Sequence, residues 1–332
     1  MEQEKDLDNG IRFESRIDLS GLQRNMDAVR KELKKVIVGQ DKLINHLLVA
    51  LLANGHVLLE GVPGIAKTLA VKLLAKAIDT SFSRVQFTPD LMPSDILGTS
   101  VFNLKTSGFE FRKGPVFANL ILVDEVNRAP AKTQAAMFEV MEERQATIDG
   151  KTYPMEKPFI VFATQNPIEQ EGTYRLPEAQ LDRFLFKVVI DYPGLAEEFE
   201  IIRREHETKG FNKTAEVNKV VSGKEIEQYQ LLVREITVES NLMTYIANIV
   251  QHTRETPFLY LGASPRASIA ILNAAKGFAA LNGRDFVTPE DIKESAIPVL
   301  RHRVIVSPEK EMEGLKAEQI IAEIIANIEI PR

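Results

Sequence analysis

An eight-residue glycine-rich loop constrains the fold of this 332-residue chain more than any other feature of its sequence. The loop reads Gly61-Val62-Pro63-Gly64-Ile65-Ala66-Lys67-Thr68 and matches the phosphate-binding pattern GxxxxGK[ST], except that alanine stands at the last glycine position. A short apolar run at 56–60 precedes the loop, and an amphipathic segment beginning with Leu69 follows it. This order of strand, glycine loop and helix predicts an α/β nucleotide-binding fold.

Each matched position of the loop has a chemical reason. Glycines let backbone N–H groups approach phosphate oxygens closely, and the positive end of the following helix adds to the attraction. Lys67 reaches the β- and γ-phosphates, and the hydroxyl of Thr68 is a ligand for Mg²⁺. We therefore expect residues 61–69 to bind ATP, with Mg²⁺ held partly by Thr68.

Ala66 carries a β-carbon where the pattern has glycine. A residue with positive φ usually has to be glycine, whereas a residue in right-handed helical geometry does not. We expect right-handed geometry at Ala66, so that the loop tolerates the change.

The rest of the chain first continues the α/β pattern and then leaves it. Apolar runs alternate with helical segments, as in a mostly parallel sheet covered by helices; the runs are at 84–88, 120–124, 159–164 and 185–190. After about Pro193 the pattern is helical, with helix-start signals at Ser264 and Thr288. At ~150 residues per domain the length allows two domains. We place an α/β domain with N-terminal helices at 1–193, and a linker helix with a smaller all-helical domain at 194–332.

Composition and charge exclude several classes of protein. The chain is 44% hydrophobic and 27% charged, as in ordinary globular proteins. Its apolar runs are far shorter than the ~18 to 20 residues that cross a bilayer, and its polar start lacks a signal-peptide pattern, so we expect a cytoplasmic protein. With no cysteine and five scattered histidines, no protein-built metal centre is indicated. A net charge of −6 gives no global attraction to nucleic acid.

Two adjacent acids follow four apolar residues downstream of the loop. The run is Leu120-Ile121-Leu122-Val123-Asp124-Glu125, and two carboxylates beside a core strand are costly to bury unless a cation meets them. We assign Asp124 to the Mg²⁺ ligands, directly or through water, and Glu125 to orienting and activating the attacking water. The alternative is that the two acids cap a helix near Pro130.

An asparagine and several arginines complete the candidate site. Asn166 follows the run at 159–164 and can reach the water or the γ-phosphate, although Asn-Pro also commonly starts a turn. An arginine from outside the site can raise the rate of phosphoryl transfer by ~10³ to 10⁵. Arg128, Arg175 and Arg183 follow strand tips, and Arg266 begins a helix, where a cation needs an anionic partner. A surface ion pair is the alternative role for each of them.

Together these motifs resemble those of the MoxR family of AAA+ ATPases. The resemblance covers nearly the whole chain, from about Val36 to Arg332. It is carried by the loop and by three further runs: Gln86-Phe87-Thr88-Pro89-Asp90-Leu91-Met92-Pro93-Ser94-Asp95, Asp124-Glu125-Val126-Asn127-Arg128-Ala129 and Ala163-Thr164-Gln165-Asn166-Pro167. It implies an AAA+ P-loop domain with a mostly parallel sheet, followed by a smaller helical lid, and in that family alanine is common where Ala66 stands.

The resemblance also implies roles for single residues. Asn166 would be sensor 1, and Arg183 is favoured over the other two arginines as the finger that acts on the next subunit's nucleotide. Arg266 would be sensor 2, with its action in cis or in trans left open. Val38 and Gly39 belong to a segment that resembles the lining of the adenine pocket.

The family resemblance favours a ring-forming ATPase, expected to be a homo-hexamer, that hydrolyses ATP at subunit interfaces to remodel or activate protein complexes. Such proteins often act with partners that carry von Willebrand factor A domains. We expect that domain on a separate chain, because the sequence ends soon after the lid. Two insertions are also implied, at 98–117 and 145–158, and the second contains the hairpin turn Asp149-Gly150.

Two other functions stay open. Relatives with similar hairpins move on DNA, but two acids offset Lys151 and Lys157 in the second insertion, which disfavours nucleic acid as a partner. A scaffold gated by nucleotide, with little turnover, is the other alternative, and the intact Lys67 and Glu125 argue against it.

Overall fold

The protein is built on one five-stranded parallel sheet. The computed structural model describes residues 17–62, 64–166, 174, 176–208 and 213–330. All four pairings in the sheet are parallel. The strands lie in the order β2 (Phe82–Gln86), β5 (Leu120–Asp124), β8 (Ile160–Gln165), β1 (His56–Glu60) and β9 (Phe184–Val189). The predicted α/β class is therefore confirmed, with strand ends that differ by up to two residues from the predicted runs.

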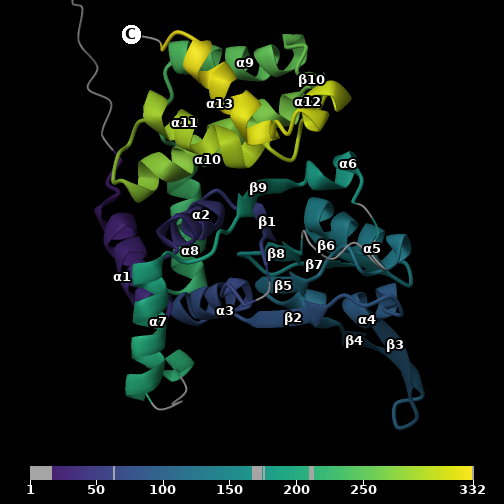
Figure 1. The fold of residues 1–332 in the computed structure, drawn as a ribbon. Coiled ribbons are helices and arrows are strands. Elements are labelled where there is room, and N and C mark those ends of the chain that lie inside the picture. The colour runs from purple at the N-terminus through teal and green to yellow at the C-terminus, as the bar shows by residue number, and fades with distance from the viewer. Residues whose placement is uncertain (1–16, 63, 167–173, 175, 209–212, 331–332) are drawn as a thin grey trace, which may run out of the picture.

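Helices cover both faces of this sheet, which is why the central strands β5 and β8 are apolar almost throughout (Figure 1). Successive strand residues point to opposite faces, so Val57 and Leu59 pack into one core while Leu58 packs into the other. The helices up to β9 are α1 (Ser20–Val36), α2 (Asp41–Leu52), α3 (Lys67–Ala77), α4 (Pro93–Leu97), α5 (Ala131–Glu143) and α6 (Glu178–Leu181).

A helical lid follows β9 and packs directly on the sheet domain. Its helices are α7 (Leu195–Thr208), α8 (Gly223–Arg234), α9 (Ser240–Glu255), α10 (Pro265–Leu281), α11 (Pro289–Leu300), α12 (Pro308–Met312) and α13 (Ala317–Asn327). The structure adds a feature that the sequence pattern did not predict, a short antiparallel ribbon of β10 (Leu259–Leu261) and β11 (Ile305–Val306). The all-helical description of the lid thus holds apart from this ribbon.

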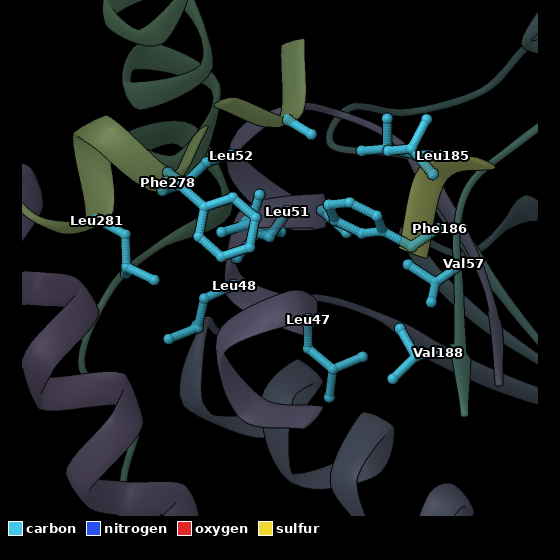
Figure 2. Packing of buried hydrophobic residues seen from close by; sticks show 14 of the residues in the cluster. Leu47, Leu48, Leu51, Leu52, Val57, Leu185, Phe186, Val188, Phe278 and Leu281 are labelled. Carbon is cyan, nitrogen blue, oxygen red and sulfur yellow. The ribbon is translucent and has the colours of Figure 1, made fainter. Parts of the chain in front are cut away.

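The two parts share one hydrophobic core. Figure 2 shows Phe278 of α10 between leucines of α2, such as Leu48 and Leu52, and close to Phe186 of β9. The rings of Phe278 and Phe186 lie 6.4 Å apart between centroids. Helix α2 is consequently buried on nearly all sides. We expect the lid to hold a fixed position on this face of the sheet, because moving it would expose that core. The proposed boundary at residue 193 stays a prediction.

Two hairpins leave the sheet domain at the positions of the implied insertions. They are β3 (Gly98–Asn103) with β4 (Gly108–Lys113), and β6 (Gln145–Ile148) with β7 (Lys151–Pro154). Asp149 and Gly150 both have positive φ, as a two-residue hairpin turn requires, so that prediction is confirmed. The hairpins touch each other through Phe111 and Tyr153, whose ring centroids lie 4.4 Å apart.

None of the helices in the described part of the chain is both long and apolar enough to cross a membrane.

Candidate active site

A large cavity lies at the carboxyl ends of the parallel strands, where ligands bind in open α/β sheets. Its volume is about 840 Å³, which suits a nucleotide. Most of the residues proposed from sequence lie together in its wall. They are Val38, Gly64, Ile65, Ala66, Lys67, Thr68, Leu69, Asp124, Glu125 and Asn166.

Some proposed residues lie elsewhere. Gly61 and Val62 do not line the cavity. Gly61 is closely packed, because a β-carbon there would collide with Ile65 and with the backbone of Ile190. Gly39 has a positive φ of 62° and adjoins the cavity without lining it. Pro63 and Arg175 lie outside the described residues.

The phosphate loop has the backbone of an anion cradle. Gly64 has φ 90°, and a β-carbon built there would meet nothing within 4 Å, so open space adjoins this backbone. Ala66 has φ 64° and ψ 15°, which is left-handed geometry, and the expected right-handed geometry was wrong. The reason is that Ala66 is the cap residue of α3, where the chain turns from the loop into the helix. For alanine this conformation costs roughly 1–2 kcal/mol.

The side chain of Lys67 folds back over the loop in this structure. Its ammonium group donates a hydrogen bond to the carbonyl oxygen of Gly61. Partial burial lowers the pKa of Lys67, while Asp124, Glu125 and Glu60 act to raise it. These three carboxylates offset part of the cost of burying the ammonium group at the floor of the cavity, where phosphate oxygens would lie.

Asp124 stands at the end of β5 with both carboxylate oxygens engaged. Its Oδ1 accepts a hydrogen bond from Thr164 Oγ1 at 3.1 Å and lies 3.5 Å from Thr68 Oγ1. Its Oδ2 accepts a hydrogen bond from Arg84 Nε at 2.6 Å. A carboxylate and a hydroxyl that face each other across the cavity floor are hard oxygen donors of the kind that Mg²⁺ takes. These residues therefore fit the ion, and Arg84 is the cation that meets the buried carboxylate in this structure.

Glu125 follows Asp124 with a positive φ of 57°, so its side chain is directed differently from a strand residue. Its carboxylate pairs with Arg128 Nε at 2.9 Å and accepts a hydrogen bond from Gln86 Nε2 at 2.8 Å. The backbone N–H of Glu125 donates to Thr164 Oγ1 at 3.0 Å. The alternative role of the acidic pair is wrong, because α5 begins at Ala131 with Pro130 as its cap residue.

Arg183 and Arg266 lie away from this cavity. Both pair with one carboxylate, that of Glu142 at the end of α5, at 2.8 Å and 3.1 Å. Arg183 also donates to the carbonyl oxygen of Phe138. Both arginines thus form ion pairs, which is the alternative role that the sequence left open for them, and the neighbouring Asp182 pairs with Arg303. The arginine in the wall of the nucleotide cavity is Arg84, and Arg128 pairs with the cavity residue Glu125, whereas Arg183 and Arg266 meet at the opposite end of the sheet.

Sequence reasoning missed four residues of these two clusters. Arg84 and Gln86 alternate on β2, and this spacing places both side chains on the face of the strand that borders the cavity. That alternation was visible in the sequence, but the partner carboxylates on β5 were not. Thr164 and Glu142 gave no signal, because a threonine in a strand and a glutamate on a helix are ordinary residues.

Comparison with known proteins agrees with this geometry. Residues 56–186 match the model of the ATPase family associated with various cellular activities (AAA), and residues 251–324 match the AAA lid domain. The protein YeaC of Bacillus subtilis is 45% identical over 301 residues, which cover 91% of this chain and 93% of YeaC. Chaperone MoxR1 of Mycobacterium tuberculosis is 44% identical over 310 residues, which cover 91% of this chain and 81% of MoxR1. A crystal structure of an ATPase from Cytophaga hutchinsonii superposes with a TM-score of 0.87 at 45% identity, covering 95% of this chain and 97% of that one.

Proposed function

This chain belongs to the MoxR-type AAA+ ATPases, and from that premise we propose that it forms a ring of six copies that hydrolyses ATP between neighbouring subunits and thereby remodels protein complexes. Its ATPase activity and nucleotide binding follow from the family. The ring, the shared site, the identity of ATP with Mg²⁺ as cofactors and the remodelling role are the proposal.

The position of Arg183 carries this proposal. It directly precedes β9, whose other end lies at the nucleotide cavity beside β1. Six residues in a strand span roughly 20 Å, so Arg183 is a full strand length from the phosphates that its own loop would bind. An arginine assigned to phosphoryl transfer at that distance has a target only on another subunit. Arg266, which shares Glu142 with it, supports the same action in trans for sensor 2.

Within one subunit, different residues of this chain would bind the phosphates, hold the metal ion and activate the water. The loop N–H groups and Lys67 bind the phosphates, and Thr68 with Asp124 holds Mg²⁺, which when bound neutralises charge on the β- and γ-phosphates. Glu125 accepts a proton from the attacking water, and Asn166 at the end of β8 orients it. For Glu125 to act, its carboxylate has to leave Arg128 or share it with the water.

Protein partners are favoured over nucleic acid by the second hairpin. Tyr153, the one aromatic side chain there that could stack on a base, is already packed against Phe111 and Phe117. Separate proteins with von Willebrand factor A domains remain our candidate partners by family resemblance, and the cytoplasmic location stays a prediction from the sequence.

Steady-state ATPase rate against protein concentration, with mass by light scattering on the same samples, tests the shared site. We expect the rate per subunit to rise as assemblies form, because each site needs arginines from a neighbour. A constant rate from a monomer would contradict the proposal and leave a self-contained nucleotide switch.

A further inference from the structure

A second hollow lies at the end of the sheet opposite to the nucleotide cavity. It consists of two adjoining cavities of about 280 and 240 Å³, whose walls share Ala53, Asn54, Arg144 and Asn273. It runs from Arg183 and Arg266 along α10 toward α8. We call it the basic groove.

The basic groove carries unbalanced positive charge. Two carboxylates line it, and both are already paired: Glu142 with Arg183 and Arg266, and Asp182 with Arg303. The smaller cavity has no carboxylate among its described lining residues. The six cations in the walls of the groove are Arg144, Arg183, Arg234, Arg266, Lys276 and Arg303.

Neutral groups hold the cations of the smaller cavity in place. Arg144 donates to the carbonyl oxygens of Asn54 and Phe159 at 2.7 and 3.1 Å, and Lys276 donates to the carbonyl oxygen of Arg234 at 2.5 Å. Partial burial lowers the pKa of Lys276, and nearby Glu235 acts to raise it. Like charges gathered in this way are stabilised by an anion from outside the subunit.

Helix α7 carries the complementary surface. It stands at the rim of the nucleotide cavity, which Glu198 and Glu205 line. Leu195, Phe199 and Ile202 are 90%, 66% and 64% exposed and form one apolar stripe at helical spacing. Glu198 borders that stripe, and its carboxylate has no partner among the described residues.

Helix α7 and the end of the basic groove at the start of β9 lie on opposite sides of one subunit. In Figure 1, α7 stands at the left of the molecule, whereas the start of β9 next to α6 lies at the right. Two different patches on opposite sides join subunits head to tail, which closes into a ring when the rotation fits. A neighbour that brings Arg183 and Arg266 to a nucleotide also brings its basic groove to the rim of that nucleotide cavity.

We propose that α7 of one subunit docks into the basic groove of a second copy of this chain. Glu198 meets Arg234 and Lys276, and the apolar stripe covers Ile269, which is 60% exposed on α10. One face of α10 carries four residues of the groove at helical spacing: Arg266, Ile269, Asn273 and Lys276. Arg266, which is assigned to the neighbour's nucleotide, therefore lies in one row with the residues that would contact α7. This inference rests on the proposed ring and names the contact that assembles it.

Charge reversal tests the contact. Glu198→Lys should raise the protein concentration at half assembly by roughly tenfold or more, because it places like charges face to face. Lys276→Glu should do the same, and the double variant should recover most of the loss. Glu255→Lys on α9 makes the same charge change far from both surfaces and should leave assembly unchanged. Mass by light scattering and thermal melting on the same samples separate assembly from folding.

Because the chain has no cysteine, cross-linking gives a second readout. A variant with both Glu198→Cys and Asn273→Cys, treated with a short bis-maleimide, should give a ladder of linked subunits on a denaturing gel, and each single variant should not. If the wild type assembles and activates but Glu198→Lys assembles equally well and no ladder forms, the docking contact is refuted while the ring stands. A wild type that stays monomeric with constant activity would overturn both.

Discussion

Removing the guanidinium group of Arg84 should strengthen metal binding at Asp124. The pair has a distance of 2.6 Å between Arg84 Nε and Asp124 Oδ2, and the side chains are 55% and 8% exposed. An ion pair with one exposed partner contributes about 1 kcal/mol. A divalent cation at Asp124 competes with that guanidinium for the same carboxylate charge. Since 1.36 kcal/mol corresponds to a tenfold change in an equilibrium constant, Arg84→Gln should tighten the binding of the cation roughly fivefold.

Titration with Mn²⁺ in the presence of saturating ADP, followed by electron paramagnetic resonance, measures this affinity without turnover. Arg30→Gln is a matched control, because Arg30 pairs with Asp27 at 2.5 Å on α1, away from the cavity. Equal or weaker Mn²⁺ binding by a folded Arg84→Gln protein would refute the competition between the arginine and the metal.

Three further perturbations follow from the site and the core. Glu125→Gln should keep ATP affinity and lower the turnover rate by roughly 100-fold or more, as loss of a general base does. Rapid filtration measures the affinity and steady-state assays measure the turnover rate. Glu139→Gln is the control and should stay active. Ala66→Gly should raise Tm by roughly 1–3 °C, because relief of left-handed strain outweighs the added unfolded-state entropy; a lower Tm would contradict the positive φ. Burial, which is the largest cause, and the charge of Arg144 lower the pKa of His56 from its usual 6.5 to about 3. As the pH falls below 6.5, the unfolded chain therefore binds a proton that the folded chain does not, and the free energy of unfolding decreases. The loss is about 2 kcal/mol at pH 5, and urea titrations of His56→Gln should show a shallower decline between pH 7 and pH 5.

The nucleotide-binding part of the candidate site could be predicted from the sequence, because its residues lie in a few short segments. The loop, the helix after it and the acidic pair after an apolar strand each signal their chemistry within a few residues, and parallel strands bring their ends to one edge. The geometry of Ala66 was not predictable from composition, because a β-carbon does not reveal the φ that the loop imposes.

The contacts between distant segments were not accessible in this way. Glu142 lies 41 positions before Arg183 and 124 before Arg266, and neither spacing signals a shared ion pair. The same holds for the packing of Phe278 on α2, because an apolar helix face does not specify its partner. The sequence therefore singled out Arg183 and Arg266 as candidates, and the fold shows the end of the sheet at which they gather, while their roles stay predictions.

Mixing two inactive variants tests most directly the claim that neighbours share an active site. Lys67→Ala should lose nucleotide binding but keep its arginine, and Arg183→Ala should bind ATP but lack turnover. In a one-to-one mixture, roughly a quarter of head-to-tail interfaces pair an intact loop with an intact Arg183, so the ATPase rate should recover to about that fraction of wild type. A rate that stays at the sum of the two separate variants, in assemblies shown by light scattering to have mixed, would contradict an arginine acting on the neighbour's nucleotide.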